Sequence, residues 1–134
     1  MTRINLVPPA DLWDKHLLAE LRELPRIPNG VLAGKYRSSP PRDFCLGAGH
    51  VLFFTDKLGW LKNRYDKLME EATHRGFRVE YRFPPIDGME GKIDWSPRNQ
   101  DVTMSKRRIE QRTPKDRKYY GKTCYDEHWG SSVA

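Results

Sequence analysis

Apolar residues recur at alternating steps of four and three through the middle of this 134-residue chain. They are Phe54, Leu58, Leu61, Tyr65, Leu68 and Ala72. Because an α-helix turns once in about 3.6 residues, this spacing puts them all on one helical face. We expect a central helix from about His50 to Arg75, about 39 Å long, with Gly76 as a left-handed C-terminal cap. Such a helix needs others to cover its apolar face.

A further helix is predicted near the start of the chain. Its apolar positions, three and four residues apart, are Trp13, Leu17, Leu21 and Leu24. Asp11 is a suitable N-cap, so we expect this helix to start near Leu12. Pro25 cannot continue the hydrogen-bond ladder, so the helix should end or bend near Leu24.

The other face of this first helix is polar. His16, Glu20 and Glu23 follow at steps of four and three, and form a stripe that we expect to point away from the packed side. Arg22 and Arg26 flank it one turn apart. Like charges at that spacing weakly destabilise a helix, so an anion over the two arginines is one interpretation. A solvated face with an ion pair between residues three apart is the other.

A third helix is expected from Ser96, with Pro97 in its first turn, to about Arg112. Arg108 and the two basic residues before it form a cluster that suits phosphate contact or a solvated basic face. Residues 77–83 alternate apolar and charged side chains, as a half-buried extended segment does, but no clear partner strand follows. We therefore expect this segment to drape over helices.

Glycine, proline and basic residues mark the connections. Residues 28–43 indicate a basic loop broken by at most one helical turn, either functional or a plain connector. Gly47 and Gly49 fit a phosphate-cradling turn or close packing where the central helix starts. Residues 117–125 interleave tyrosines with positive charge, which suits stacking on bases or packing onto helices. We expect residues 126–134 to be a flexible tail.

Charge favours an anionic partner. Lysine and arginine number 24 against 18 aspartates and glutamates, a net charge of +6, which leaves nucleic acid and acidic membrane surfaces open. No apolar run approaches the roughly 20 residues of a spanning helix, and a signal peptide is lacking. We expect an intracellular, cytoplasmic protein, with Cys45 and Cys124 reduced. Scattered histidines and cysteines argue against a metal site, and no cofactor motif occurs.

These patterns predict an all-α fold: a compact single domain over residues 1–134, with about three main helices and long connecting loops. At this point the residues resemble a known family, the phage-type pyrimidine-dimer DNA glycosylase and apurinic-site lyase, or endonuclease V of the phage kind. The matching stretches are Met-Thr-Arg-Ile-Asn-Leu at the start, His16-Leu17, Ala19-Glu20, Arg22 through Arg26, residues 46–51, Phe53-Phe54, Asp56-Lys57-Leu58 and Lys118 through Lys122. The Arg22 to Arg26 block at this distance from a Met-Thr-Arg start is the most specific part.

The resemblance implies that the main-chain amine of Thr2, freed by removal of Met1, is a nucleophile. An α-amine has a pKa near ~7.7–8.0 and a lysine near ~10.4, so the terminal amine offers far more unprotonated nitrogen at neutral pH. It would displace the base from the anomeric sugar carbon and form an imine, and β-elimination would then expel the 3′ phosphate. Glu23 is similar to the family's catalytic carboxylate. Neither metal nor cofactor is needed.

The expected partner is damaged double-stranded DNA, bound by a monomer. Arg3, Arg22 and Arg26, with His16 beside them, resemble the family's clamp on the phosphates around the lesion, and relatives kink the duplex and turn a nucleotide out. The predicted DNA-contacting set is completed by Arg108, Lys118, Tyr119 and Tyr120.

The chain departs from the family's pattern at two places that bear on which lesion it prefers. Asp116-Arg117 replaces the family's aromatic pair, and Lys15 stands where a neutral amide is expected. One alternative is therefore the same lyase chemistry on another lesion, such as ring-opened purines. The other is a non-catalytic basic DNA-binding protein whose arginines only position the backbone.

Overall fold

A computed structural model of the chain describes residues 2–112 and the backbone of residues 118–119 and 122–123. Its elements are the 3-10 turns η1 (Pro9–Asp11) and η2 (Gly47–Gly49), the helices α1 (Asp14–Glu23), α2 (Arg26–Leu32), α3 (His50–Phe54), α4 (Leu58–His74) and α5 (Asn99–Gln111), and the two-residue strands β1 (Lys118–Tyr119) and β2 (Lys122–Thr123). The predicted all-α fold is confirmed. The described helices are all too short or too polar to cross a membrane.

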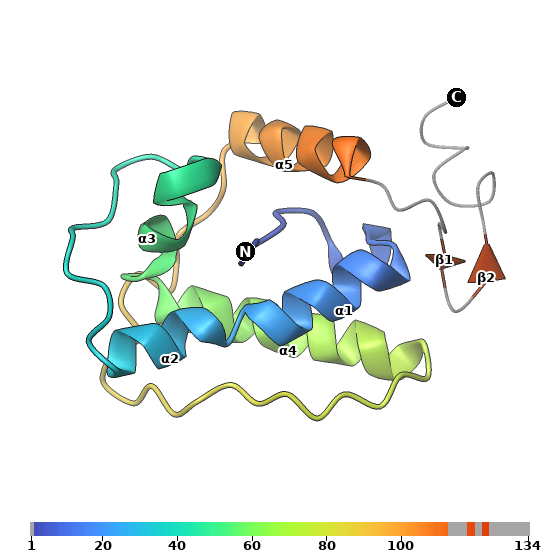
Figure 1. The fold of residues 1–134 in the computed structure, drawn as a ribbon, viewed down its shortest axis with the longest axis horizontal. Coiled ribbons are helices and arrows are strands. Elements are labelled where there is room, and N and C mark those ends of the chain that lie inside the picture. The colour runs from blue at the N-terminus through green and yellow to red at the C-terminus, as the bar shows by residue number, and fades with distance from the viewer. Residues whose placement is uncertain (1, 113–117, 120–121, 124–134) are drawn as a thin grey trace.

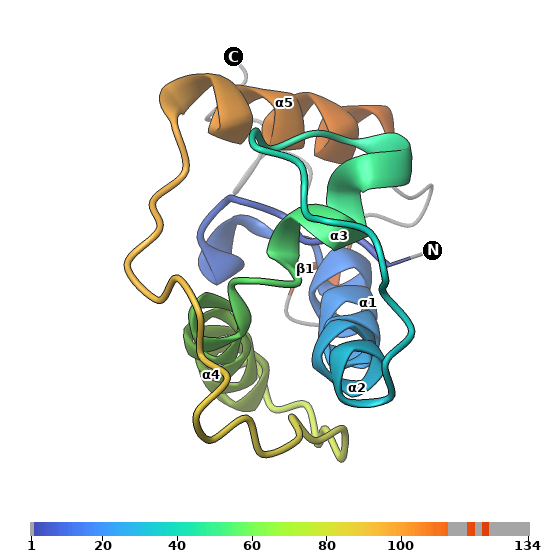
Figure 2. The ribbon, with the colours of Figure 1, turned by 90° about the vertical axis from the view of Figure 1, so that its left-hand side faces the viewer.

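The helices enclose the start of the chain. In Figure 1, α1 and α2 follow each other along α4, while α5 lies on the opposite side of the extended residues 2–7, here called the N-terminal segment. Figure 2 shows the same order from the side, with the N-terminal segment between α5 and the α1–α4 pair. The segment is therefore surrounded by helices that come from distant parts of the sequence.

One hydrophobic core joins these elements. The apolar stripes predicted for the first and central helices are buried, with Leu17, Leu21, Leu61 and Leu68 at 0 % exposure. The N-terminal segment also contributes to this core, since Ile4 and its apolar neighbours are buried in it. Burial of such side chains stabilises each by about 1.5–3 kcal/mol.

The predicted single central helix is wrong, because it breaks between α3 and α4. In an unbroken helix, the Gly59 N–H and the Asp56 carbonyl would bond within the helix. Instead Gly59 N donates to the Glu90 carbonyl at 2.7 Å, and Asp56 O accepts from Lys92 N at 2.8 Å. Gly91 has φ +65°, and a Cβ there would lie 2.0 Å from Asp56 O, so this close approach requires glycine.

Two helix starts also differ from the prediction. α1 begins at Asp14 because Asp11 belongs to the preceding 3-10 turn. α5 begins at Asn99, where the Asp101 carboxylate accepts the Arg98 N–H at 3.0 Å and so satisfies an N-terminal donor. The predicted roles of Pro25 and Gly76 are confirmed: α1 ends just before Pro25, and Gly76 has φ +86° after α4.

The connections mostly follow the prediction. The expected loop from residue 28 is shorter, because α2 continues to Leu32. Residues 77–83 are extended without strand pairing, and three of the four alternate apolar side chains, Phe77, Val79 and Phe83, are half-buried against the core as predicted, whereas Tyr81 is exposed. At Gly49, a Cβ would lie 2.7 Å from Cys45 Sγ, which favours close packing at the helix start over a phosphate-cradling turn. The expected flexible tail, residues 126–134, lies outside the described residues.

Candidate active site around the N-terminal segment

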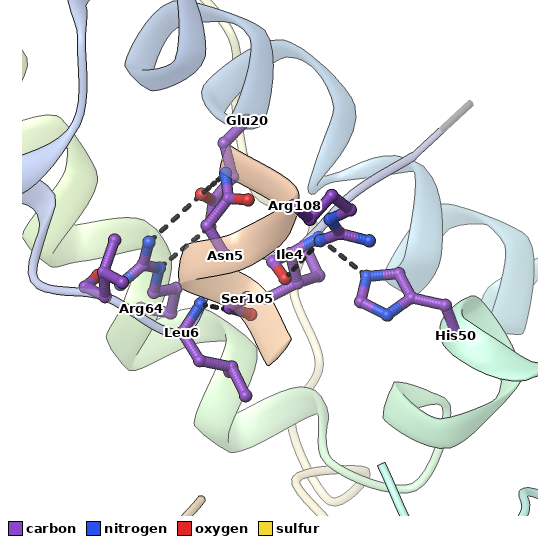
Figure 3. A network of polar contacts seen from close by, with 9 residues as sticks. Ile4, Asn5, Leu6, Glu20, His50, Arg64, Ser105 and Arg108 are labelled. Atoms are coloured by element: carbon purple, nitrogen blue, oxygen red, sulfur yellow. Dashed lines mark hydrogen bonds and ion pairs between the residues drawn. The ribbon is translucent and has the colours of Figure 1, made fainter. Parts of the chain in front are cut away.

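Side chains from three helices hold the backbone of the N-terminal segment (Figure 3), and one of them is Arg64 of α4, whose Nη1 donates to the Val7 carbonyl at 2.5 Å. Ile4 N donates to His50 Nε2 at 2.9 Å, and Ile4 O accepts from Arg108 Nη2 at 3.1 Å. Leu6 N donates to Ser105 Oγ at 3.2 Å. Buried backbone groups need partners, and here side chains supply what a neighbouring strand supplies in a sheet. The segment is thus fixed in place without belonging to any regular element.

Among the side chains that accept a hydrogen bond from the backbone of the N-terminal segment, His50 bonds the residue nearest the start of the chain. Its Nδ1–H donates to the Cys45 carbonyl at 2.9 Å, which leaves Nε2 unprotonated to receive the Ile4 N–H. Burial, followed by the positive charge of Arg108, lowers the pKa of His50 from 6.5 to about 4. The imidazole is therefore neutral at physiological pH, as the contact with Ile4 requires.

Glu20 anchors the same segment from α1. Its carboxylate accepts two bonds from Arg64 on α4, at 2.8 and 3.1 Å, and one from Asn5 Nδ2 at 2.9 Å (Figure 3). At 1 % exposure, Glu20 does not point away from the packed side as predicted. The buried Arg64 guanidinium draws it inward, because an ion pair with this many hydrogen bonds offsets the cost of desolvating both charges.

A cavity of about 220 Å³ lies beside the N-terminal segment, between α1 and α5. The residues around it are polar and titratable for the most part. They are Arg3, Asn5, His16, Ala19, Glu20, Glu23, Arg108, Ile109 and Arg112. Of the predicted site residues, the structure brings Arg3, His16, Glu23 and Arg108 together at this cavity.

The cavity has an excess of positive charge. Arg3, Arg108 and Arg112 line it, whereas the Glu20 carboxylate is already paired with Arg64. Burial, followed by the charge of Arg3, lowers the pKa of Arg108 to about 10. Arg108 Nε is also buried without a hydrogen-bond partner among the described residues. A bound anion would relieve both the repulsion and the unsatisfied donor.

His16 is held at the same cavity by α5. Its Nε2 lies 3.0 Å from the Arg112 carbonyl, which can only accept, so Nε2 carries the proton in this bond. Burial lowers the pKa of His16, and this effect is larger than the opposite effect of the hydrogen bond to the Arg112 carbonyl. Nδ1 is buried without a partner among the described residues, so the neutral ring leaves an acceptor free at the site.

Glu23 and the two predicted arginines of the first helix lie at the cavity rim and beyond it. The Glu23 side chain is 13 % exposed and receives a 3.3 Å contact from Arg22 Nη2. Arg22 and Arg26 are exposed and are not part of the cavity wall. The ion pair of this face joins the sequence neighbours Arg22 and Glu23 and not residues three apart as expected, and Arg26, at the start of α2, is exposed.

The remaining predicted residues fall in the C-terminal part. Lys118 and Tyr119 form β1, whose backbone lies beside α1 (Figure 1), and Tyr120 lies outside the described residues. Thr2 is half-buried and directly precedes Arg3 at the cavity. The described residues contain no cluster of His, Cys, Asp or Glu able to hold a metal.

Several residues that build the site were not predicted to belong to it. They are Asn5, Glu20, His50, Ser105 and Arg112. For Asn5, Glu20 and His50 the only signal was that they fall in stretches that resemble the family, and none of these stretches indicates which residues contact one another. Ser105 and Arg112 carry no local signal, because their role depends on α5 packing across the start of the chain.

The fold and cavity define a class: a basic helical protein with a cavity lined by arginines beside its N-terminal segment. A family model described as pyrimidine dimer DNA glycosylase matches residues 1–84. The chain belongs to this family, and it is a DNA glycosylase of the kind that acts in repair at pyrimidine dimers. The matched range includes Arg3, Glu20, Glu23 and His50, while α5, which supplies the opposite wall of the cavity, follows it.

Proposed function

We propose that this protein excises the damaged base at cyclobutane pyrimidine dimers in duplex DNA and then cuts the strand as a lyase. The observation that carries the proposal is the convergence of Arg3 and Glu23 at one basic cavity beside the start of the chain. The protein acts as a monomer, needs no metal or cofactor, and works on DNA inside the cell.

The nucleophile is the α-amine of Thr2 once Met1 has been removed. It attacks the anomeric carbon of the damaged nucleotide, the bond to the base breaks, and the base leaves with a proton. The bond between the anomeric carbon and the ring oxygen then breaks, the ring oxygen takes a proton to become a hydroxyl, and the opened sugar is left joined to Thr2 by an imine. The imine accepts the electron pair released when the adjacent sugar carbon loses a proton. The carbon–oxygen bond to the 3′ phosphate then breaks, and hydrolysis of the imine frees the enzyme.

Glu23 is the carboxylate of this reaction. Its negative charge stabilises the positive charge that builds on the sugar as the base departs, and its oxygens carry the proton during ring opening and elimination. At 13 % exposure its side chain is largely shielded from water, so this charge acts in a medium of reduced dielectric.

Basic residues around the cavity bind the DNA backbone. Arg3 and Arg108 contact the phosphates next to the lesion, and this role is supported by Arg108 Nε, which has no hydrogen-bond partner in the described part of the chain. His16 contributes to the same contacts. Arg22 and Arg26, both exposed, bind phosphates farther along the duplex. Lys118, Tyr119 and Tyr120 complete the interface.

Borohydride trapping tests this mechanism. Reduction of the imine on a duplex with a thymine dimer or an abasic site should yield a covalent adduct that maps to Thr2, in protein whose loss of Met1 is verified by mass spectrometry. A variant with one alanine inserted before Thr2 is the control, since it shifts the amine by about 3.3–3.6 Å of chain. No adduct from the verified protein would refute the nucleophile.

Glu23→Gln separates binding from chemistry. The variant should bind the damaged duplex but lose strand cleavage, because the amide has the shape of the carboxylate without its charge. Retained cleavage would remove Glu23 from the mechanism. A panel of duplexes that includes ring-opened purines identifies the lesion, and binding without an adduct or a nick would favour a non-catalytic DNA-binding protein.

A further inference from the structure

The geometry of the N-terminal segment depends on one side chain close to its start. The Ile4 N–H, two residues after Thr2, donates to His50 Nε2 at 2.9 Å. Arg108 holds the carbonyl of the same residue at 3.1 Å. Two consecutive peptide units are therefore oriented: His50 accepts from the Arg3–Ile4 unit, which leads to Thr2, and Arg108 donates to the Ile4–Asn5 unit.

His50 is built as a fixed acceptor. The Cys45 carbonyl takes the proton of Nδ1, so the lone pair of Nε2 faces Ile4. Phe44 and Phe54 pack edge-on against the ring, with centroids 5.5 and 5.4 Å away, and the side chain is 2 % exposed. This packing prevents the ring from turning, and the mechanism proposed above gives it no other task.

We propose that His50 is a positioning residue for the reaction: by accepting the Ile4 N–H, it sets where the Thr2 amine lies relative to Glu23. This inference rests on the proposed function. Only Thr2 and Arg3 lie between this peptide unit and the amine. If the Arg3–Ile4 peptide unit rotates, the amine therefore moves by a distance comparable to a bond length. Misplacement of about 1 Å can cost on the order of a hundredfold in rate.

Two substitutions at one position distinguish positioning from mere structure. In His50→Gln, Oε1 reaches the place of Nε2 and can still accept the Ile4 N–H. In His50→Asn, the shorter amide reaches only the place of Nδ1, so the bond to Cys45 can survive while the Ile4 N–H loses its partner. The measurement is the single-turnover rate of borohydride-trapped adduct on duplex with an abasic site, with the Kd for the same duplex measured separately.

The expected result is a split between chemistry and binding. His50→Asn should slow adduct formation by about tenfold or more, and His50→Gln by less than about threefold, with Kd nearly unchanged in both. Leu68→Val, a core truncation on α4, is the control for lost stability and should leave the rate unchanged. An Asn variant as fast as the wild type, or a Gln variant as slow as Asn, would overturn the inference.

The two proposals fail differently. Wild-type protein that forms no adduct refutes the Thr2 mechanism, whereas a wild-type adduct with a fully active His50→Asn refutes only the role of His50. If His50→Asn does not fold, the donor can be removed instead. Joining a synthetic fragment 2–44, which starts with the free amine of Thr2, to recombinant 45–134 at Cys45 allows an ester to replace the amide between Arg3 and Ile4. This full-length protein should be as slow as we expect for His50→Asn, and a wild-type rate would contradict the proposal.

Discussion

Acid should destabilise this protein through His50, by an amount that follows from its pKa. The pKa is 6.5 in the unfolded chain and about 4 in the fold, because burial and the charges of Arg108 and Arg3 disfavour the imidazolium. Below pH 6.5 the unfolded chain binds a proton that the native state does not. Stability therefore falls as pH decreases from about 6.5 to about 4 and levels off below.

The difference of about 2.5 pKa units corresponds to roughly 3 kcal/mol at 1.36 kcal/mol per unit. The assay is urea unfolding at pH 7 and pH 4, at constant ionic strength, for the wild type and His50→Gln. Glutamine cannot titrate, so the loss of unfolding free energy between the two pH values should be smaller in the variant by about 3 kcal/mol.

Other groups contribute to acid unfolding and must be subtracted. The lowered pKa of His16 acts in the same direction, and so does the lowered pKa of Asp56, which its bonds to Lys57 and Lys92 bring about against the opposing effect of burial. These contributions are common to both proteins and cancel in the comparison. His74→Gln, at an exposed histidine, is the matched control. If the free energy of unfolding depends on pH equally in wild type and His50→Gln, the lowered pKa of His50 is not a cause of acid unfolding and the argument is refuted.

Three further perturbations test other parts of the structure. Glu20→Gln leaves the buried Arg64 guanidinium without its charge partner and should cost about 3–5 kcal/mol in urea unfolding; a change below about 1 kcal/mol would contradict the network. Gly91→Ala forces a Cβ against Asp56 O and should lower stability by more than about 1 kcal/mol, seen as a lower Tm. Arg26→Ala should weaken DNA binding and reduce the salt slope by about 0.9 if the residue contacts one phosphate.

The sequence could predict those parts of the fold in which apolar residues recur at helical spacing. The stripes of the first and central helices predicted the helices, and the buried faces agree with them. The break at residues 55–57 escaped prediction, because its cause is a backbone contact with residues 90–92, more than thirty positions away. The same apolar spacing is compatible with one helix or two.

The site likewise contains some residues that could be predicted from the sequence and others that could not. The charged residues of the first helix and Arg3 were assigned to the site through the resemblance to the family, and Glu23 does reach the cavity with Arg3. Glu20 was assigned to the solvated stripe because helical spacing alone places it there. Its burial depends on Arg64, forty-four positions later, whose guanidinium approaches from a different helix. A carboxylate on a polar stripe and a carboxylate in a buried pair look identical in sequence.

The family model matches only part of the residues that form the site, and α5 lies outside the match. The way in which the N-terminal segment is held explains why α5 is nevertheless needed. An extended segment without a strand beside it must satisfy its backbone groups from side chains, and each such side chain has to be rigid to hold it. His50, Arg64, Ser105 and Arg108 meet this need at separations of 46, 57, 99 and 104 positions. Since two of the four are on α5, any terminal nucleophile here depends on a helix more than ninety residues away, and its geometry is a property of the assembled fold.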